Sequence, residues 1–188
     1  MESYELNACV DRLNRLKKDV QYRQKKGLPF ILASVIIWAL ILLSRIAAAD
    51  LRTANLMTFI CCCLLIPLAT LFSKLLKADI FRKTGNPLNS LVVLATLNQL
   101  LYLLIAMWAF DRRPDAMLMI YAMIFGAHLL PYSWVYQSKS YMLMSILVPI
   151  LALVVGLMAQ PHVLAGIMFG LEIAFSIALV VENKALES

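Results

Sequence analysis

Charged residues are scarce in this chain. Asp, Glu, Lys and Arg make up 15% of its 188 residues, whereas a soluble domain carries about a quarter. Hydrophobic residues make up 62%, and the mean hydropathy is +0.81. These values exclude an ordinary soluble domain. Because the apolar residues come in runs of about 20, the length is taken up by helices and short loops, and a separate soluble catalytic domain is not expected.

The sequence also lacks the short motifs of the common enzyme and metal classes. It contains no HExxH, no GxSxG and no glycine-rich phosphate loop. Its four cysteines form no CxxC pair, and Cys61, Cys62 and Cys63 are consecutive. Neighbours on a helix point about 100° apart, so these thiols are not expected to share one metal ion. We therefore predict no catalytic residues, no metal site and no cofactor, and the sequence leans away from an enzyme.

What the chain has in abundance is apolar segments of about the length of a bilayer crossing. Polar loops separate most of them, of which Arg82–Pro87 and Asp111–Asp115 are the clearest. The sequence predicts an all-α membrane protein, a bundle of six transmembrane helices occupying residues 28–182, with 183–188 as a tail. The expected spans are residues 28–48, 54–74, 89–110, 116–137, 140–159 and 162–182.

Residues 1–27 are polar and precede the first span. Their apolar residues follow a three-four spacing that places them on one face of a helix, and basic residues occupy much of the rest. A short amphipathic helix of this kind suits an anionic lipid surface or a partner protein, and a plain solvated helix fits the pattern equally well. The apolar stripe consists of Leu6, Cys9, Val10, Leu13, Leu16 and Val20.

Lys and Arg indicate the orientation in the membrane. They concentrate in residues 1–27, in the loop after the second span and near the C-terminus, which predicts a cytoplasmic position for both termini. The orientation of the chain in the membrane therefore explains the net charge of +6, and no nucleic acid partner is expected. Aromatic residues near the span ends are expected at the lipid headgroups: Trp108, Trp134, Tyr136 and Tyr141.

Three spans carry polar residues at a similar depth. Glu172 lies near the middle of the last span, and His128 near the middle of the fourth. A carboxylate at mid-membrane is costly and tends to face the bundle interior in a functional role. The functional hypothesis is a pocket in which Glu172 and His128 form a proton-sensitive pair, and the structural alternative is that these residues only join helices. The expected walls are Asn98, Gln99, Tyr102 and Tyr132.

Gly166 and Gly170 form a GxxxG pattern in the last span. Small residues at this spacing let two membrane helices approach closely. The pattern therefore indicates a helix contact on a different face from Glu172, and it leaves an oligomer through this face open.

Several stretches resemble a family of small bacterial multi-pass membrane proteins known as a domain of unknown function. They are KKGLPFILASVIIW, LFSKLLKADIF, TLNQLLYLLIAMWAF and MLMIYAMIFGAHLLPYSWVYQSKSYM. The similarity runs from about Lys25 through the fifth span and weakens after it. It implies a bacterial inner-membrane protein of this size and no particular activity.

Three functions are compatible with these patterns. The leading hypothesis is a small proton-linked transporter or ligand-binding protein with a midplane polar pocket. The alternative is a non-catalytic membrane partner or scaffold protein that acts through residues 1–27. An intramembrane enzyme ranks third, because one carboxylate and one imidazole do not define a reaction.

Overall fold

The computed structural model describes residues 2–80 and 85–187, and the side chains of residues 5–80 and 85–186. Every described element is a helix. Six helical segments are long and apolar enough to cross a membrane, which confirms the predicted number and suggests a multi-pass membrane protein. Residues 82–84 of the predicted loop at Arg82–Pro87 lie outside the described residues.

The helices follow one another with short connections. The first, α1 (Glu2–Gln24), is joined through the 3-10 turn η1 (Lys25–Gly27) to α2 (Leu28–Ala47). The remaining elements are α3 (Leu51–Cys62), α4 (Leu65–Leu75), α5 (Pro87–Arg112), α6 (Met117–Ala127), α7 (Leu130–Val135), α8 (Lys139–Met158) and α9 (Pro161–Glu187). Together α3 and α4 make the second candidate span, and α6 and α7 make the fourth.

Local chemistry explains where several helices begin. The side chain of Asp50 accepts a hydrogen bond from the Thr53 amide at the start of α3, and this bond holds the pKa of the Asp50 carboxyl below its usual value. Asn86 and Ser138 act in the same way for α5 and α8. The break between α6 and α7 comes just before Pro131, whose ring has no N–H to donate and disfavours a continuous helix.

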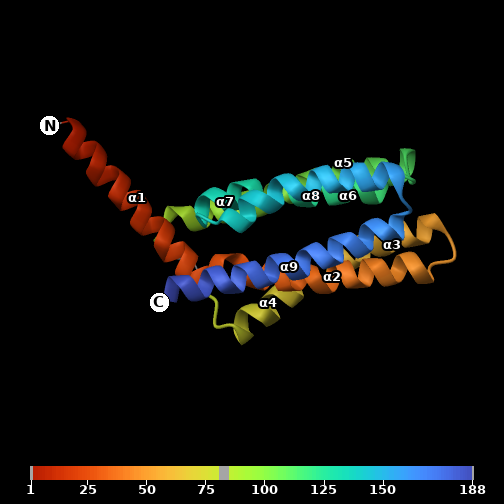
Figure 1. Ribbon diagram of the computed structural model, residues 1–188, viewed down its shortest axis with the longest axis horizontal. Helices are drawn as coiled ribbons and strands as arrows, with labels where there is room; N and C mark the ends of the chain where they lie inside the picture. Colours follow the sequence, from red (N-terminus) through yellow and green to blue (C-terminus); the bar gives the residue numbers. More distant parts are fainter. Residues whose placement is uncertain (1, 81–84, 188) are drawn as a thin grey trace.

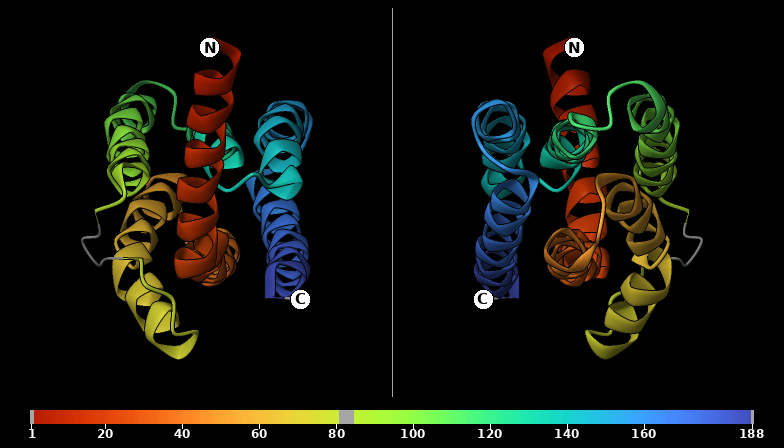
Figure 2. Two further views of the ribbon diagram at one scale, coloured as in Figure 1. Left: turned by 90° about the vertical axis from the view of Figure 1, so that its left-hand side faces the viewer. Right: turned by 90° about the vertical axis from the view of Figure 1, so that its right-hand side faces the viewer.

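The spanning helices form two layers (Figure 1). One layer contains α2, with α9 on one side and α3 and α4 on the other; the second contains α6 and α7 between α5 and α8 (Figure 2). Trp38 on α2 is fully buried between the layers, where its ring contacts Tyr121 and Phe125 of α6. The centre of the core is therefore aromatic and apolar.

Within the second layer, α6 and α8 approach closely at two glycines. A Cβ atom at Gly126 would come within 2.5 Å of Pro149, and one at Gly156 within 2.5 Å of Met119. Gly166 and Gly170 behave differently, because a Cβ there would meet only Leu42 at 3.9 Å or nothing within 4 Å. The predicted GxxxG pair is thus not used for close packing inside the described chain.

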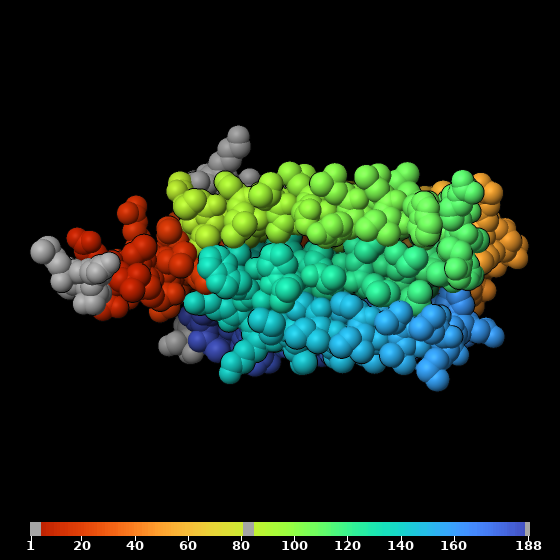
Figure 3. Space-filling view, turned by 90° about the horizontal axis from the view of Figure 1, so that it is seen from above, coloured from red at the N-terminus to blue at the C-terminus, as the bar shows by residue number. Residues whose placement is uncertain are grey.

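The outer surface of the bundle is apolar along its length. Figure 3 shows α5, α6 and α8 side by side on one face, and large aliphatic side chains such as Leu104 (61% exposed) and Leu157 (71%) point outward. Soluble monomers rarely expose a continuous apolar surface of this extent. The surface fits a lipid environment.

Both chain termini lie at the same end of the bundle, which we call the proximal end (Figure 1). From there α1 projects away from the bundle, so that Leu6 and Val10 are 65% and 47% exposed. The second half of α1 is docked: the amide of Asn86 donates to the Leu16 carbonyl, and the Lys17 ammonium lies 3.4 Å from the centre of the Trp134 ring. The apolar stripe of residues 1–27 is therefore divided between a packed and an exposed half.

Candidate functional site

A cavity of about 50 Å³ lies in the proximal half of the bundle. One wall comes from Gly27 of η1 and from α2 up to Ser34. The other walls come from Leu65 of α4, from α5 and from the segment between α6 and the start of α8. Six of its fourteen lining residues carry aromatic rings, and Ser34, Thr96 and Gln99 add polar groups. The lining residues are Gly27, Phe30, Ile31, Ser34, Leu65, Val92, Thr96, Gln99, Phe125, His128, Leu129, Tyr132, Tyr136 and Tyr141.

Glu172 lies directly behind one wall of this cavity. It is fully buried, and its Oε2 accepts a hydrogen bond from the hydroxyl of Ser34, which lines the cavity. Within the described part of the chain, its other oxygen has no hydrogen-bond partner.

Two further buried polar atoms near Glu172 have no partner among the described residues. They are the indole nitrogen of Trp38, one turn from Ser34 on α2, and the hydroxyl of Ser176, one turn from Glu172 on α9. A buried polar group without a partner costs about 1–3 kcal/mol. Such groups are rare in native proteins, and each calls for a reason such as a functional role.

The structure brings most, but not all, of the predicted pocket residues together. His128, Gln99 and Tyr132 line the cavity, and Glu172 adjoins it through Ser34. The His128 ring packs edge-on against Tyr132, and its Nδ1 hydrogen-bonds the Phe125 carbonyl, so it is not paired with Glu172. Asn98 is exposed and Tyr102 is 39% exposed, and neither lines the cavity.

The proximal floor of the cavity is an unusual bend between α1 and α2, which we call the elbow (residues 25–27). Lys25, Lys26 and Gly27 all have positive φ, at 46°, 48° and 70°. Lysine rarely adopts this conformation, which costs roughly 1–2 kcal/mol per residue, so surrounding contacts must hold it. A Cβ at Gly27 would lie 2.8 Å from the Tyr141 hydroxyl, which explains glycine at this position.

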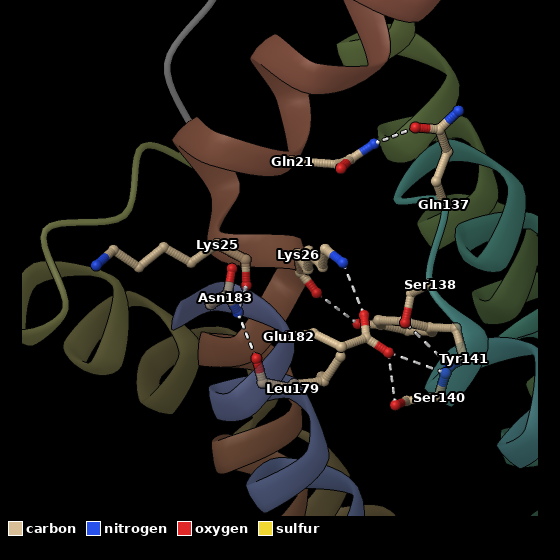
Figure 4. Close-up of polar contacts among 10 residues, drawn as sticks. All are labelled: Gln21, Lys25, Lys26, Gln137, Ser138, Ser140, Tyr141, Leu179, Glu182 and Asn183. Atoms are coloured by element: carbon tan, nitrogen blue, oxygen red, sulfur yellow. Dashed lines mark hydrogen bonds and ion pairs between the residues drawn. The ribbon is translucent and has the colours of Figure 1, made fainter. Parts of the chain in front are cut away.

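A set of polar contacts, which we call the clamp, holds the elbow (Figure 4). The buried Lys26 ammonium lies 2.7 Å from a carboxylate oxygen of Glu182 at the end of α9, and the other oxygen accepts bonds from the amide and hydroxyl of Ser140. The Tyr141 hydroxyl donates to the Lys26 carbonyl at 3.0 Å, and the Asn183 amide donates to the Lys25 carbonyl at 3.0 Å. The clamp thus joins the elbow to α8 and α9.

Tyr136 and Tyr141 correct one expectation from the sequence. They were predicted to lie at the lipid headgroups, but they are only 2% and 3% exposed. Their hydroxyls bond to the elbow segment instead: Tyr136 donates to Gln24 Oε1 at 2.7 Å, and Tyr141 to the Lys26 carbonyl. A tyrosine needs a polar partner for its hydroxyl, and here the folded-back chain provides it in place of the headgroups. Trp108 and Trp134 remain about half exposed.

Sequence reasoning missed several residues of the site. Ser34, Trp38 and Ser176 are ordinary residues in apolar spans. Only the bond to Glu172 distinguishes Ser34, and only burial of a polar atom without a partner distinguishes the other two. Glu182 is recognisable in the sequence as a second carboxylate in the last span, ten positions after Glu172. These two carboxylates are separated by nearly three turns of α9, or about 15 Å along the helix axis.

Comparison with known protein families identifies the family of this chain. One family, described as "Family of unknown function (DUF7010)", matches residues 13–182. The chain belongs to this family. The match begins before Lys25 and extends through the last spanning helix, so it includes Glu172. No curated protein and no solved structure matches the chain.

Proposed function

We propose that this member of the DUF7010 family is a small proton-linked transporter that binds its substrate in the cavity, with Glu172 as the proton-carrying group. The observation that carries the proposal is the position of Glu172: it is fully buried and one oxygen is bonded to a residue of the cavity wall. Interhelical hydrogen bonds in membranes are worth about 0.6–2 kcal/mol, so a carboxyl group is an expensive way to join two helices.

We further propose that the protein lies in a bacterial inner membrane with the proximal end in the cytoplasm. The distribution of basic residues supports this orientation. Those of α1, the elbow and the ends of α4 and α9 lie at the proximal end, whereas the distal end carries Arg45, Arg52, Arg112 and Arg113. Cytoplasmic segments of membrane proteins are enriched in Lys and Arg.

In this arrangement the elbow is the cytoplasmic gate of the cavity. Gly27, Tyr136 and Tyr141 form its floor, and the clamp fixes that floor to α8 and α9. Passage to the cytoplasm requires these contacts to separate. The elbow has an unfavourable backbone conformation, and this strain is relieved when the clamp opens. The relief offsets part of the free energy needed to break the contacts of the clamp.

Transport is tested with purified protein in lipid vesicles that contain a pH-sensitive dye. A panel of small cationic and neutral compounds is added outside, and the internal pH is followed for wild type, Glu172→Gln and Glu5→Gln, an exposed control on α1. A compound-dependent pH change that is lost only in Glu172→Gln supports the proposal. Equal signals from all three proteins, or none from any, would reject proton-linked transport, provided that each variant elutes and melts as a folded protein.

The exposed half of α1 supports a second candidate, a membrane partner protein. Leu6 and Val10 project beyond the bundle with large exposed fractions. On this alternative, deletion of the first turns of α1 abolishes function in cells while Glu172→Gln has no effect. The opposite pattern favours transport.

A further inference from the structure

The cavity combines features that select for a positive charge. Its aromatic rings come from three helical segments, and the rings of Tyr132, Tyr136 and Tyr141 lie within 5.5–6.0 Å of one another. Aromatic rings attract cations through their electron-rich faces, most strongly where water is excluded. Phe30 and Phe125 add further rings to the same lining.

The charged groups around the cavity also favour a positively charged ligand. No Lys, Arg, Asp or Glu is among the described residues that line it. The carboxylate adjoining it is Glu172, whose charge no described cation pairs with. Two buried basic groups of the fold have partners elsewhere: Lys26 pairs with Glu182, and the two terminal guanidinium nitrogens of Arg45 bond Asn55 and Thr58. A cation in the cavity is therefore one side chain, Ser34, away from a carboxyl group that no described cation pairs with, whereas an anion finds no Lys or Arg on the described walls. His128, the imidazole on the wall, bonds the Phe125 carbonyl through Nδ1.

The size of the cavity restricts the ligand further. A volume of about 50 Å³ holds about three to five water molecules at roughly 10–15 Å³ each. We propose that the cavity binds a small monovalent alkylammonium ion, with the tyrosine rings around its methyl groups and the Glu172 carboxylate balancing its charge. This inference rests on the proposed function, because it names the substrate class of the same site.

Binding is tested by calorimetry with the full chain in lipid nanodiscs, so that no transport is required. The probe is tetramethylammonium; tert-butanol is a neutral molecule of similar shape, and acetate is a small anion. We expect saturable binding of tetramethylammonium alone. Binding should weaken by at least about tenfold in Glu172→Gln and in Tyr132→Leu, and by less than about threefold in Tyr132→Phe, which keeps the ring.

Matched controls separate a ring effect from a general effect of substitution. Tyr22→Leu removes a tyrosine that is 65% exposed on α1, and Glu5→Gln neutralises an exposed carboxylate; both should bind like wild type. If Tyr132→Leu or Glu172→Gln does not fold, the comparison of the three probes on wild type still decides the question.

Several results would overturn the inference. Equal affinity for tert-butanol would show that the cavity does not recognise charge. Binding of acetate in preference to tetramethylammonium would show that the cavity selects anions. Absence of heat with all three probes would exclude this ligand class. In each case a Glu172-dependent pH change with another compound in the vesicle assay would leave proton-linked transport standing, so the two proposals fail separately.

Discussion

Substitution of Lys26 by Met breaks the buried ion pair of the clamp. The Lys26 side chain is 7% exposed, that of Glu182 is 21% exposed, and their charged atoms lie 2.7 Å apart. Removing one partner of a fully buried pair costs about 3–5 kcal/mol, and an exposed pair contributes about 0–1 kcal/mol. This pair is between these limits, and Glu182 keeps its bonds from Ser140, so we expect a loss of about 2–3 kcal/mol.

The loss is measured as a thermal midpoint in detergent. For a chain of this size, about 2–3 kcal/mol corresponds to a decrease of roughly 4–12 °C. Lys184→Met, an exposed lysine two positions after Glu182, is the control and should change the midpoint little. The double variant Lys26→Met/Glu182→Leu removes both charges and should be no less stable than Lys26→Met, because no unpaired charge remains.

The same variants test whether the clamp closes the cavity. A cysteine at Ser34, in a background without the exposed thiols Cys9 and Cys63, reports access of a water-soluble maleimide to the cavity wall. We expect faster labelling when Lys26→Met is added. A stability of Lys26→Met equal to that of Lys184→Met, together with unchanged labelling, would refute the reasoning.

Three other outcomes follow from the packing and from the site. Gly126→Ala places a Cβ within 2.5 Å of Pro149 and should cost about 1–3 kcal/mol in thermal melts, whereas Gly170→Ala, with nothing within 4 Å, should be neutral; equal effects would contradict the close approach of α6 and α8. Tyr141→Phe removes the hydroxyl that donates to the elbow and should cost about 0.5–1.5 kcal/mol, and an unchanged midpoint would argue against that bond. Gly27→Ala combines a positive φ with a contact of 2.8 Å to Tyr141 and should be more destabilising than Tyr141→Phe; the reverse order would count against a strained elbow.

The number of helices long and apolar enough to span a membrane was predictable, because it depends on local sequence. A run of about 20 apolar residues crosses a bilayer whatever its neighbours are. The break before Pro131 and the cap at Asn86 are equally local. The burial of Glu172 follows from the cost of a carboxylate in lipid.

The elbow and the walls of the cavity were not predictable, because they depend on contacts between distant segments. Lys26 looks like an ordinary basic residue before a span until Glu182, 156 positions later, is placed beside it. Asn98 and Gln99 are adjacent in the sequence, and only the rotation of α5 decides that Gln99 lines the cavity while Asn98 is exposed. A sequence pattern gives the depth of a polar residue but not the direction it faces when the helix is apolar all round.

The central claim is that Glu172 exchanges a proton for the ligand of the cavity, and proton release on binding tests it most directly. Purified protein in weakly buffered nanodisc solution, near neutral pH, is mixed with tetramethylammonium, and a pH indicator counts the protons released per cation bound. We expect up to one proton per cation for wild type and for Glu5→Gln, and none for Glu172→Gln. Release that is unchanged in Glu172→Gln, or binding to wild type without release at any pH tested, would contradict it.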